Sequence, residues 1–325
     1  MYIVSVRMEV KDCKDWQDLA GGAINIMLIA DKWQDYEILD TGNGEKLERW
    51  GPYTLRRPDP QVIWPASLNK EIWDKADGVY HRSNSGGGSW EYRKQIPSSW
   101  KIKYNDLAFK IEPTGFKHTG LFPEQAVNWD WMASKIKAAG KESGRTAGQP
   151  IKVLNLFAYT GGATVACTKA GATVCHVDAA KGMVSWAKEN LGLSNLANRP
   201  ARFIVDDCMK FIKREQRRES KYDAVIMDPP SYGRGPGGEV WKIEDTLYNF
   251  VEEIAKILSD KPLFVLINSY TTGFAPTVTE NILKLTVNKK FKGIVTSGEV
   301  GLRATKSGIV LPCGIYGRWE RSLSP

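Results

Sequence analysis

Polar residues that could hold a ligand recur where apolar runs of this chain end. The run that contains NLFAYTGG (155–162) ends in a glycine pair, and Asp178 closes the next run. Glycine lets a ligand approach the backbone closely, and the start of a helix offers free N–H groups. A carboxylate such as Asp178 can accept hydrogen bonds from both hydroxyls of a ribose. These residue types and their spacing predict a site for a nucleoside.

The number of glycines narrows the kind of nucleoside. A dinucleotide-binding turn normally has three glycines, which let a pyrophosphate reach the start of a helix. The stretch TGGATVAC (160–167) has only two, Gly161 and Gly162. A dinucleotide oxidoreductase is therefore a disfavoured alternative. The pattern favours a ligand that has a ribose and no phosphate, a description that S-adenosyl-L-methionine fits.

Two further carboxylates close later apolar runs. Asp207 ends FIVDD (203–207), where it could reach the adenine amino group, with Asp206 as the competing choice. DPPSY (228–232) closes the fourth run. The alternative is that these four motifs are turns that follow strands by coincidence and bind no ligand. Open α/β sheets bind ligands outside the carboxyl ends of their strands, so we expect these motifs to meet at one edge of a sheet.

The elements that position these motifs alternate along the chain from about residue 118 onward. We expect strands at 151–157, 173–177, 201–205, 223–227 and 262–268, helices at 162–170, 180–191, 207–218, 244–259 and about 277–288, and a final antiparallel hairpin at 293–298 and 309–319. Such alternation predicts an α/β fold, with a parallel sheet covered by helices on both faces.

The first part of the chain has a different composition. It is rich in tryptophan and has turn signals such as TGNG (41–44), which predicts a small β-rich module over 1–117 and a second domain over 118–325. Between Trp90 and Phe109, aromatic residues alternate with cations. That pattern suits single-stranded nucleic acid and the core of a β module alike, and we favour the core.

Charge is divided unevenly between these parts. The chain has 325 residues and a formal net charge of +8. Residues 1–117 contain as many Lys and Arg as Asp and Glu, so the whole positive excess lies in residues 118–325. If the chain has a polyanionic partner such as nucleic acid, any basic face for it therefore belongs mainly to the C-terminal part.

Cysteine and histidine usage predicts neither disulfides nor a metal site. The five cysteines lack paired spacing, which indicates free thiols in a reducing compartment. His81, His118 and His176 have no partner at metal-ligand spacing. The apolar run 23–30 is too short to span a membrane, so we expect a cytoplasmic protein with no membrane partner.

Five segments together carry a family resemblance. They are HTGLFPEQ (118–125), NLFAYTGG (155–162), VDAAKGMVSWAKEN (177–190), DDCMKFI (206–212) and DPPSYG (228–233). Through them, residues 118–320 resemble the class I methyltransferases, and more closely a subgroup of bacterial 23S ribosomal RNA methyltransferases. The resemblance implies a Rossmann-like, seven-stranded sheet. The RNA-binding PUA module that often precedes this domain is not recognisable in residues 1–117.

The same resemblance implies a cofactor and the residues that bind it. The cofactor is S-adenosyl-L-methionine, the product is S-adenosyl-L-homocysteine, and the partner is RNA, ribosomal RNA above all. The resemblance places Phe122, Pro123 and Gln125 at the methionine end, Asn155, Ala158 and Tyr159 in the cofactor loop, and Asp178 at the ribose. The expected cofactor-binding set is completed by Gly161, Ala179, Asp207 and Asp228.

The remaining question is which atom accepts the methyl group. Methyl transfer from a sulfonium needs a nucleophile aligned with the methyl carbon. Carbon-5 of a pyrimidine is a poor nucleophile until a cysteine thiolate adds to the ring. Ser231 and the segment 268–270 stand where relatives with that chemistry carry the cysteine. A base nitrogen is therefore the expected nucleophile, and Cys313 is the residue to consider for the carbon alternative.

The DPPSY motif supplies the groups for a nitrogen nucleophile. The Asp228 carboxylate and the Pro229 carbonyl can accept hydrogen bonds from an amine or a ring nitrogen, and Pro230 completes the expected catalytic motif. Tyr232 can stack on a flipped base or pack against the cofactor instead. The glycine-rich stretch 233–238 suits a loop over the site or a plain surface connection. We therefore expect an S-adenosylmethionine-dependent methyltransferase that acts on a base nitrogen of RNA. The alternatives are a small-molecule or protein methyltransferase with a closed pocket, and a non-catalytic RNA-binding protein.

Overall fold

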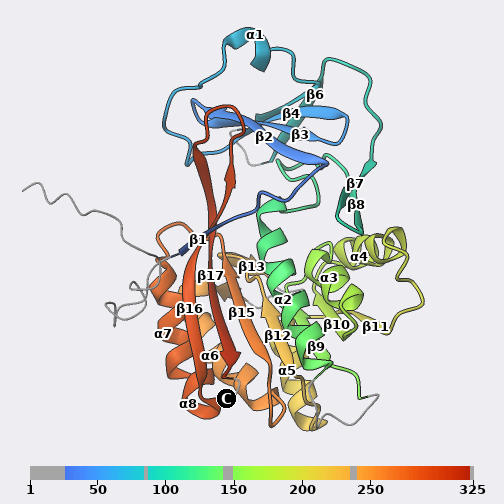
Figure 1. Ribbon diagram of the computed structural model, residues 1–325, viewed down its shortest axis with the longest axis vertical. Coiled ribbons are helices and arrows are strands. Elements are labelled where there is room, and N and C mark those ends of the chain that lie inside the picture. Colours follow the sequence, from blue (N-terminus) through green and yellow to red (C-terminus); the bar gives the residue numbers. More distant parts are fainter. Residues whose placement is uncertain (1–25, 84–86, 142–148, 235–239, 323–325) are drawn as a thin grey trace, which may run out of the picture.

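The computed structural model describes residues 26–83, 87–141, 149–234 and 240–322, which form two regions (Figure 1). A large sheet flanked by helices lies at one end, and a smaller β-rich region lies at the other. Among the helices of these ranges, none is both long and apolar enough to cross a membrane.

The large sheet has eight strands. In spatial order they are β1 (Ile26–Ile29), β16 (Gly293–Arg303), β17 (Val310–Arg321), β15 (Phe264–Ser269), β12 (Ala224–Met227), β9 (Lys152–Leu156), β10 (Thr173–Asp178) and β11 (Ala201–Val205). β17 is antiparallel to both neighbours, and the other pairs are parallel. The predicted α/β class is confirmed. The sheet gains an eighth strand because β1 pairs with β16, so the β16–β17 hairpin does not form the edge.

Helices cover both faces of this sheet because successive strand residues point to opposite sides. Val153 belongs to the core beneath α2 (Ala126–Ala139), α3 (Gly162–Lys169) and α4 (Lys181–Leu193). Leu154 belongs to the core beneath α5 (Cys208–Arg217), α6 (Ile243–Ile257), α7 (Pro276–Leu285) and α8 (Val287–Phe291). The single helix expected near 277–288 is divided at Thr286, whose ψ of −85° interrupts the helix.

The β-rich region contains a five-stranded sheet and a separate hairpin. Its elements are β2 (Tyr36–Gly42), β3 (Glu45–Trp50), β4 (Tyr53–Pro58), α1 (Lys70–Trp73), β5 (Gly78–Arg82), β6 (Gly88–Tyr92), β7 (Trp100–Tyr104) and β8 (Leu107–Ile111). Trp100 donates its indole N–H to the Trp50 carbonyl at 2.9 Å, and Tyr104 and Phe109 are buried. These contacts favour the core interpretation of the aromatic segment.

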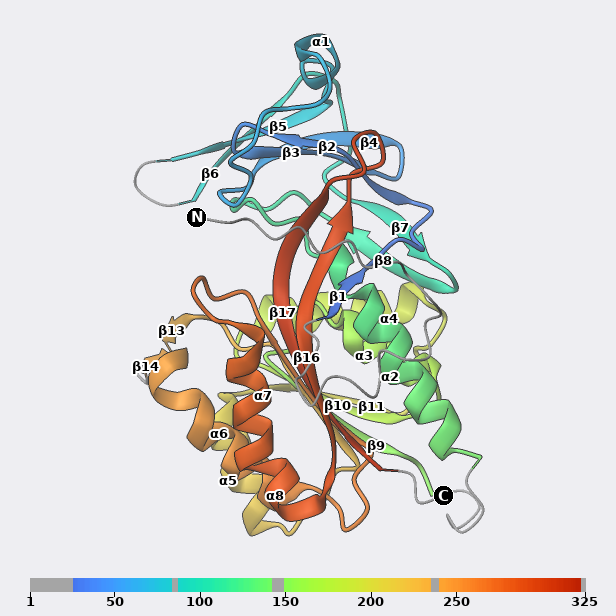
Figure 2. The same ribbon diagram turned by 60° about the vertical axis from the view of Figure 1, so that its left-hand side comes forward.

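Long-range contacts hold the β-rich region over the large sheet. The β16–β17 hairpin reaches it (Figure 2), where the Thr305 N–H donates to the Ile38 carbonyl of β2 at 2.9 Å. Below it, the Trp33 indole donates to the Pro123 carbonyl at 2.9 Å, at a 3-10 turn, Pro123–Gln125. The domain boundary expected near residue 117 falls between β8 and this turn and stays a prediction.

Candidate functional site

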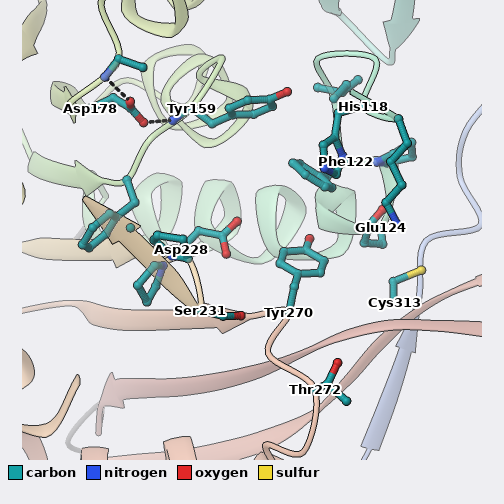
Figure 3. A pocket seen from close by; sticks show the side chains of 18 of the residues that line it. His118, Phe122, Glu124, Tyr159, Asp178, Asp228, Ser231, Tyr270, Thr272 and Cys313 are labelled. Carbon is teal, nitrogen blue, oxygen red and sulfur yellow. Dashed lines mark hydrogen bonds between the residues drawn. The ribbon is translucent and has the colours of Figure 1, made fainter. Parts of the chain in front are cut away.

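A cavity of about 710 Å³ lies between the two regions, at the carboxyl ends of β9, β10 and β12 (Figure 3). β9 leads through α3 to β10 on one side, whereas β12 lies on its other side. This reversal of strand order is where open α/β sheets bind ligands. The fold therefore brings the strand-end motifs to one cavity, which the β-rich region closes from above.

The loop after β9 is held in place by Asp178. The Asp178 Oδ2 atom accepts a hydrogen bond from the Tyr159 N–H at 2.8 Å, and Oδ1 accepts one from the Ala180 N–H at 2.9 Å. The loop has left-handed residues at Tyr159 (φ 50°) and Gly161 (φ 83°), and a Cβ at 161 would lie 2.8 Å from the Ala187 Cβ. Position 161 therefore requires glycine, and Asp178 and Tyr159 both line the cavity.

Aromatic rings surround the cavity beside these carboxylates. The Phe122 ring lies 5.4 Å from His118, 5.6 Å from Tyr159 and 5.2 Å from Tyr270, measured between centroids. Aromatic faces attract a ligand cation, and carboxylates accept hydrogen bonds from sugar hydroxyls. The donor set therefore fits a ligand that has both a positive charge and a ribose.

Asp206 and Asp207, the two alternative partners predicted for the adenine amino group, lie in different surroundings in the structure. Asp207 lines the cavity together with Ala179, and its Oδ1 caps α5 by accepting the Lys210 N–H at 2.9 Å. Asp206 lies outside the lining and pairs with Arg214 at 2.7 Å. The geometry favours Asp207 as the residue that a bound nucleoside would meet.

Four other predicted residues lie in or beside the loop after β9. Gln125, Asn155, Ala158 and Gly161 line a small adjoining cavity of about 60 Å³. The Gln125 amide donates to the Tyr270 hydroxyl at 2.7 Å, and the Asn155 amide donates to Thr164 Oγ1 at 2.9 Å. In this structure their polar groups hold the loop and Tyr270, whereas Phe122 and Pro123 line the main cavity.

Asp228 presents a carboxylate to the cavity. It follows β12 and points toward Tyr270 (Figure 3), and no residue of the described ranges donates a hydrogen bond to its side chain. Burial raises its pKa to about 7, and the negative charge of Glu124 adds to this effect. Pro229 and Pro230 line the same wall, where the Pro230 carbonyl accepts the Trp241 indole N–H at 2.6 Å.

Tyr232 lies apart from this wall. It belongs to β13 (Tyr232–Arg234), which pairs with β14 (Val240–Lys242), and it is 53% exposed. Its hydroxyl accepts the Arg234 Nε–H at 3.0 Å, and it is not among the residues that line the cavity. The loop expected at 233–238 falls largely outside the described residues, and a role for Tyr232 in stacking stays a prediction.

Glu124 and Tyr270 line the cavity and had not been assigned to the site from the sequence. Glu124 is buried, which raises its pKa, and Tyr270 lies between it and Asp228 (Figure 3). Cys313 lines the cavity too, where burial raises the pKa of its thiol and the charge of Glu124 adds to the shift. A thiol so shifted stays protonated and is a poor nucleophile. Glu124 lies within HTGLFPEQ, which is the one signal that could have identified it.

Known proteins match this chain in sequence and in fold. A family model described as S-adenosylmethionine-dependent methyltransferase matches residues 46–251. The solved structure of the SAM-dependent methyltransferase from Agrobacterium tumefaciens is 35% identical, covers 92% of this chain and 94% of its own, and superposes with a TM-score of 0.85. The structure of SMU.776 complexed with SAH shares the fold at 19% identity and a TM-score of 0.64, over 89% of this chain and 76% of its own.

A curated relative matches a shorter part of the chain. The ribosomal RNA large subunit methyltransferase K/L of Shewanella frigidimarina is 32% identical over 163 residues, which is 50% of this chain and 21% of the relative. The chain thus spans about a fifth of the length of the curated relatives it matches.

Proposed function

Because the chain belongs to the S-adenosylmethionine-dependent methyltransferase family, we propose that it methylates a base nitrogen of RNA, with ribosomal RNA as the target. The curated relatives named for large-subunit ribosomal RNA support this substrate. The positive excess of residues 118–325 agrees with a polyanionic partner.

The cavity provides the groups that this function needs to hold the cofactor. Asp178 would accept the ribose hydroxyls, Asp207 would meet the adenine, and the rings of Phe122, Tyr159 and Tyr270 would surround the positive charge. The bound cofactor supplies an electrophilic methyl carbon. The work left to this chain is to align a nucleophile with that carbon.

The observation that carries the proposal is the carboxylate of Asp228, which accepts no hydrogen bond from the described residues. A half-buried acceptor without a protein donor favours a substrate that brings one. An N–H of the target base would donate to Asp228, which orients the nitrogen lone pair toward the methyl carbon. The nitrogen loses a proton as it gains the methyl group, and a carboxyl with a pKa of about 7 can accept it.

Methylation of carbon-5 of a pyrimidine is disfavoured because it needs a cysteine thiolate to add to the ring. Ser231 follows the two prolines, and its hydroxyl shares a hydrogen bond with Thr271 Oγ1 at 2.7 Å. Cys313 is in the cavity wall, but burial raises its pKa. Covalent activation of carbon-5 needs the ionised sulfur.

Transfer of a tritiated methyl group into total RNA from a strain that lacks this gene tests the proposal. Analysis of the labelled nucleosides should give a base methylated on nitrogen. Label in 5-methylcytidine would overturn the nitrogen assignment and make Cys313 the candidate nucleophile. No transfer into any RNA by protein that binds S-adenosylhomocysteine would overturn the RNA assignment.

One observation favours a second candidate, a small-molecule substrate. The β-rich region contributes Tyr36, Lys46, Arg57 and Asp59 to the lining, so one side of the cavity is closed by protein. A single flipped nucleotide fits such a site, and so does a free metabolite. Methyl transfer into a small-molecule extract, with none into RNA, would select the second candidate.

A further inference from the structure

Charged side chains of the β-rich region form one end of the cavity, and one of them, Arg57, is bound through all three of its guanidinium nitrogens. Arg57 Nε and Nη2 donate to Glu48 at 2.6 and 2.7 Å, and Nη1 donates to the Lys117 carbonyl at 2.7 Å. Glu48 also accepts the Tyr36 hydroxyl at 2.7 Å. This cluster ties β3 to β4, and every nitrogen of Arg57 already has a partner.

Two lysines at the same end are not saturated. Lys46 Nζ lies 3.3 Å from Asp59 Oδ2, which is its one ion pair within the described ranges. An ammonium group has three N–H donors, so Lys46 keeps donors to spare. Lys117 is half-buried, lines the cavity, and makes no ion pair with any described residue. A lysine withdrawn from water without a partner is costly, which points to a ligand that supplies one.

The balance of charge gives this end a positive potential. Its ionic groups are the cations Lys46, Arg57 and Lys117 and the carboxylates Glu48 and Asp59. Burial lowers the pKa of Lys117, and the charges of Lys46, Arg57 and Arg82 act in the same direction. The pKa of His118 falls to about 4 through burial and the same cations. The neighbouring Glu124 has a raised pKa, chiefly from burial, and the cations Lys46 and Arg57 oppose that shift.

The opposite end has the opposite character. Asp178, Asp207 and Asp228 line it, and none of them pairs with a cation among the described residues. Figure 3 shows Asp178 and Cys313 on opposite sides of the cavity. The positive charge of Lys46 lowers the pKa of the Cys313 thiol, so Lys46 belongs to the Cys313 side. A cationic cofactor suits the carboxylate end. The lysine end suits an anion.

We propose that Lys46 and Lys117 form a subsite for the phosphate of the nucleotide that is methylated. The proposal rests on the proposed function, because it takes the substrate to be a nucleotide. A volume of about 710 Å³ lies in the upper half of the range for ligand sites, roughly 300–1,000 Å³, so the cofactor and one nucleotide can share it. With the base at Asp228, the phosphate of the same nucleotide meets the two ammonium groups.

Lys46→Met and Lys117→Met test the subsite, because methionine keeps an apolar stem and removes the charge. Each should raise KM for RNA about fivefold with little change in the affinity for S-adenosylhomocysteine. The slope of log KM against log salt should fall by about 0.7, the value for one lost phosphate contact on a single strand. Lys75→Met, on an exposed residue after α1, is the matched control and should change neither quantity.

A merely structural role for the lysines would lower the melting temperature and leave the salt slope unchanged. Unchanged KM and slope in folded variants would overturn the subsite. If Lys46→Met does not fold, Lys117→Met decides, since its side chain is half-buried in a connecting segment. Lys46→Arg keeps the charge and should keep the slope.

Free nucleosides and their monophosphates separate failure of the subsite from failure of the proposed function. If the wild-type protein methylates no RNA, the RNA assignment falls. A preference of wild type for a monophosphate over its nucleoside, lost in Lys117→Met, would still support the subsite. Equal use of both would overturn it.

Discussion

The two ends of the cavity use charge differently. At the end formed by the large sheet, carboxylates bind backbone or stand without a donor: Asp178 accepts the N–H groups of Tyr159 and Ala180, and Asp228 accepts none from the described residues. At the end formed by the β-rich region, charges bind each other across strands, as Glu48 and Arg57 do at 2.6 Å.

This difference indicates a division of labour. Asp178 ends β10 and Asp207 caps α5, so these two carboxylates are fixed by local geometry and suit a cofactor. The charges of the β-rich region are fixed by its packing over the sheet, so the region could vary with the substrate while the cofactor end stays the same. Substitutions at the two ends should therefore change different kinetic quantities.

Asp228→Ala should have the largest effect. Turnover should fall about 100-fold, at the lower end of what a positioned acid–base group contributes, which is about 2.7 kcal/mol of barrier. Calorimetry with S-adenosylhomocysteine should show nearly unchanged affinity. Equal losses of affinity and rate would mean that Asp228 serves the cofactor instead.

Asp178→Ala should mainly reduce cofactor affinity. The side chain accepts two backbone N–H groups, and we propose that it also accepts the ribose hydroxyls. Hydrogen bonds to charged groups contribute about 2 kcal/mol, so the Kd for S-adenosylhomocysteine should rise about 30-fold. An unchanged Kd in a folded variant would remove Asp178 from the cofactor site.

The pH dependence of kcat/KM should report Asp228. Its pKa in the folded protein, about 7, lies above the ordinary value of 3.8, so the folded state holds this proton more tightly. Ionisation therefore reduces stability as pH rises from about 4 to about 7, while it produces the acceptor that activity needs. Between pH 6 and 8, kcat/KM should rise about tenfold and then level off.

Asp228→Asn is the control for that profile, because it keeps the shape of the side chain and cannot ionise. Its profile should be flat over the same interval. A rise that persists in Asp228→Asn would assign the titration to another group, with Glu124 the first to examine because its pKa is also raised by burial.

The smallest effect should separate Asp207 from Asp206. Asp207→Ser keeps a residue that can cap α5 and shortens the side chain away from the adenine position. The Kd for S-adenosylhomocysteine should rise only about threefold, because Asp207 is half-buried and water can replace it as the partner of the adenine amino group. Asp206→Ser, outside the lining, should leave this Kd unchanged. A larger rise in Asp206→Ser than in Asp207→Ser would assign the adenine contact to Asp206 instead.

The carboxylate end could be predicted from sequence because each of its motifs is local. Asp178 and Asp228 follow apolar runs directly, and the topology of a parallel sheet brings such strand ends together. Helix α2 was missed although Trp129, Met132 and Ile136, all buried, follow a helical spacing. Strand β1 has only four residues and pairs with β16 near the other end of the chain, so no local pattern identifies it.

The lysine end could not be predicted because it depends on packing between distant segments. Lys46 and Asp59 face the cavity only because β3 and β4 lie over the segment that contains His118. A balanced composition over residues 1–117 conceals this arrangement, since the positive potential arises from Lys46, Arg57 and Lys117 together. Tyr232 shows the converse, for a residue inside a recognisable motif lies outside the cavity lining.

A crystal structure with S-adenosylhomocysteine tests the central claim most directly. The account predicts the ribose hydroxyls on the Asp178 carboxylate, the adenine beside Asp207, and the sulfur directed toward Asp228, with the lysine end free for substrate. A ligand bound against Lys46 and Lys117, or a sugar without contact to Asp178, would contradict it.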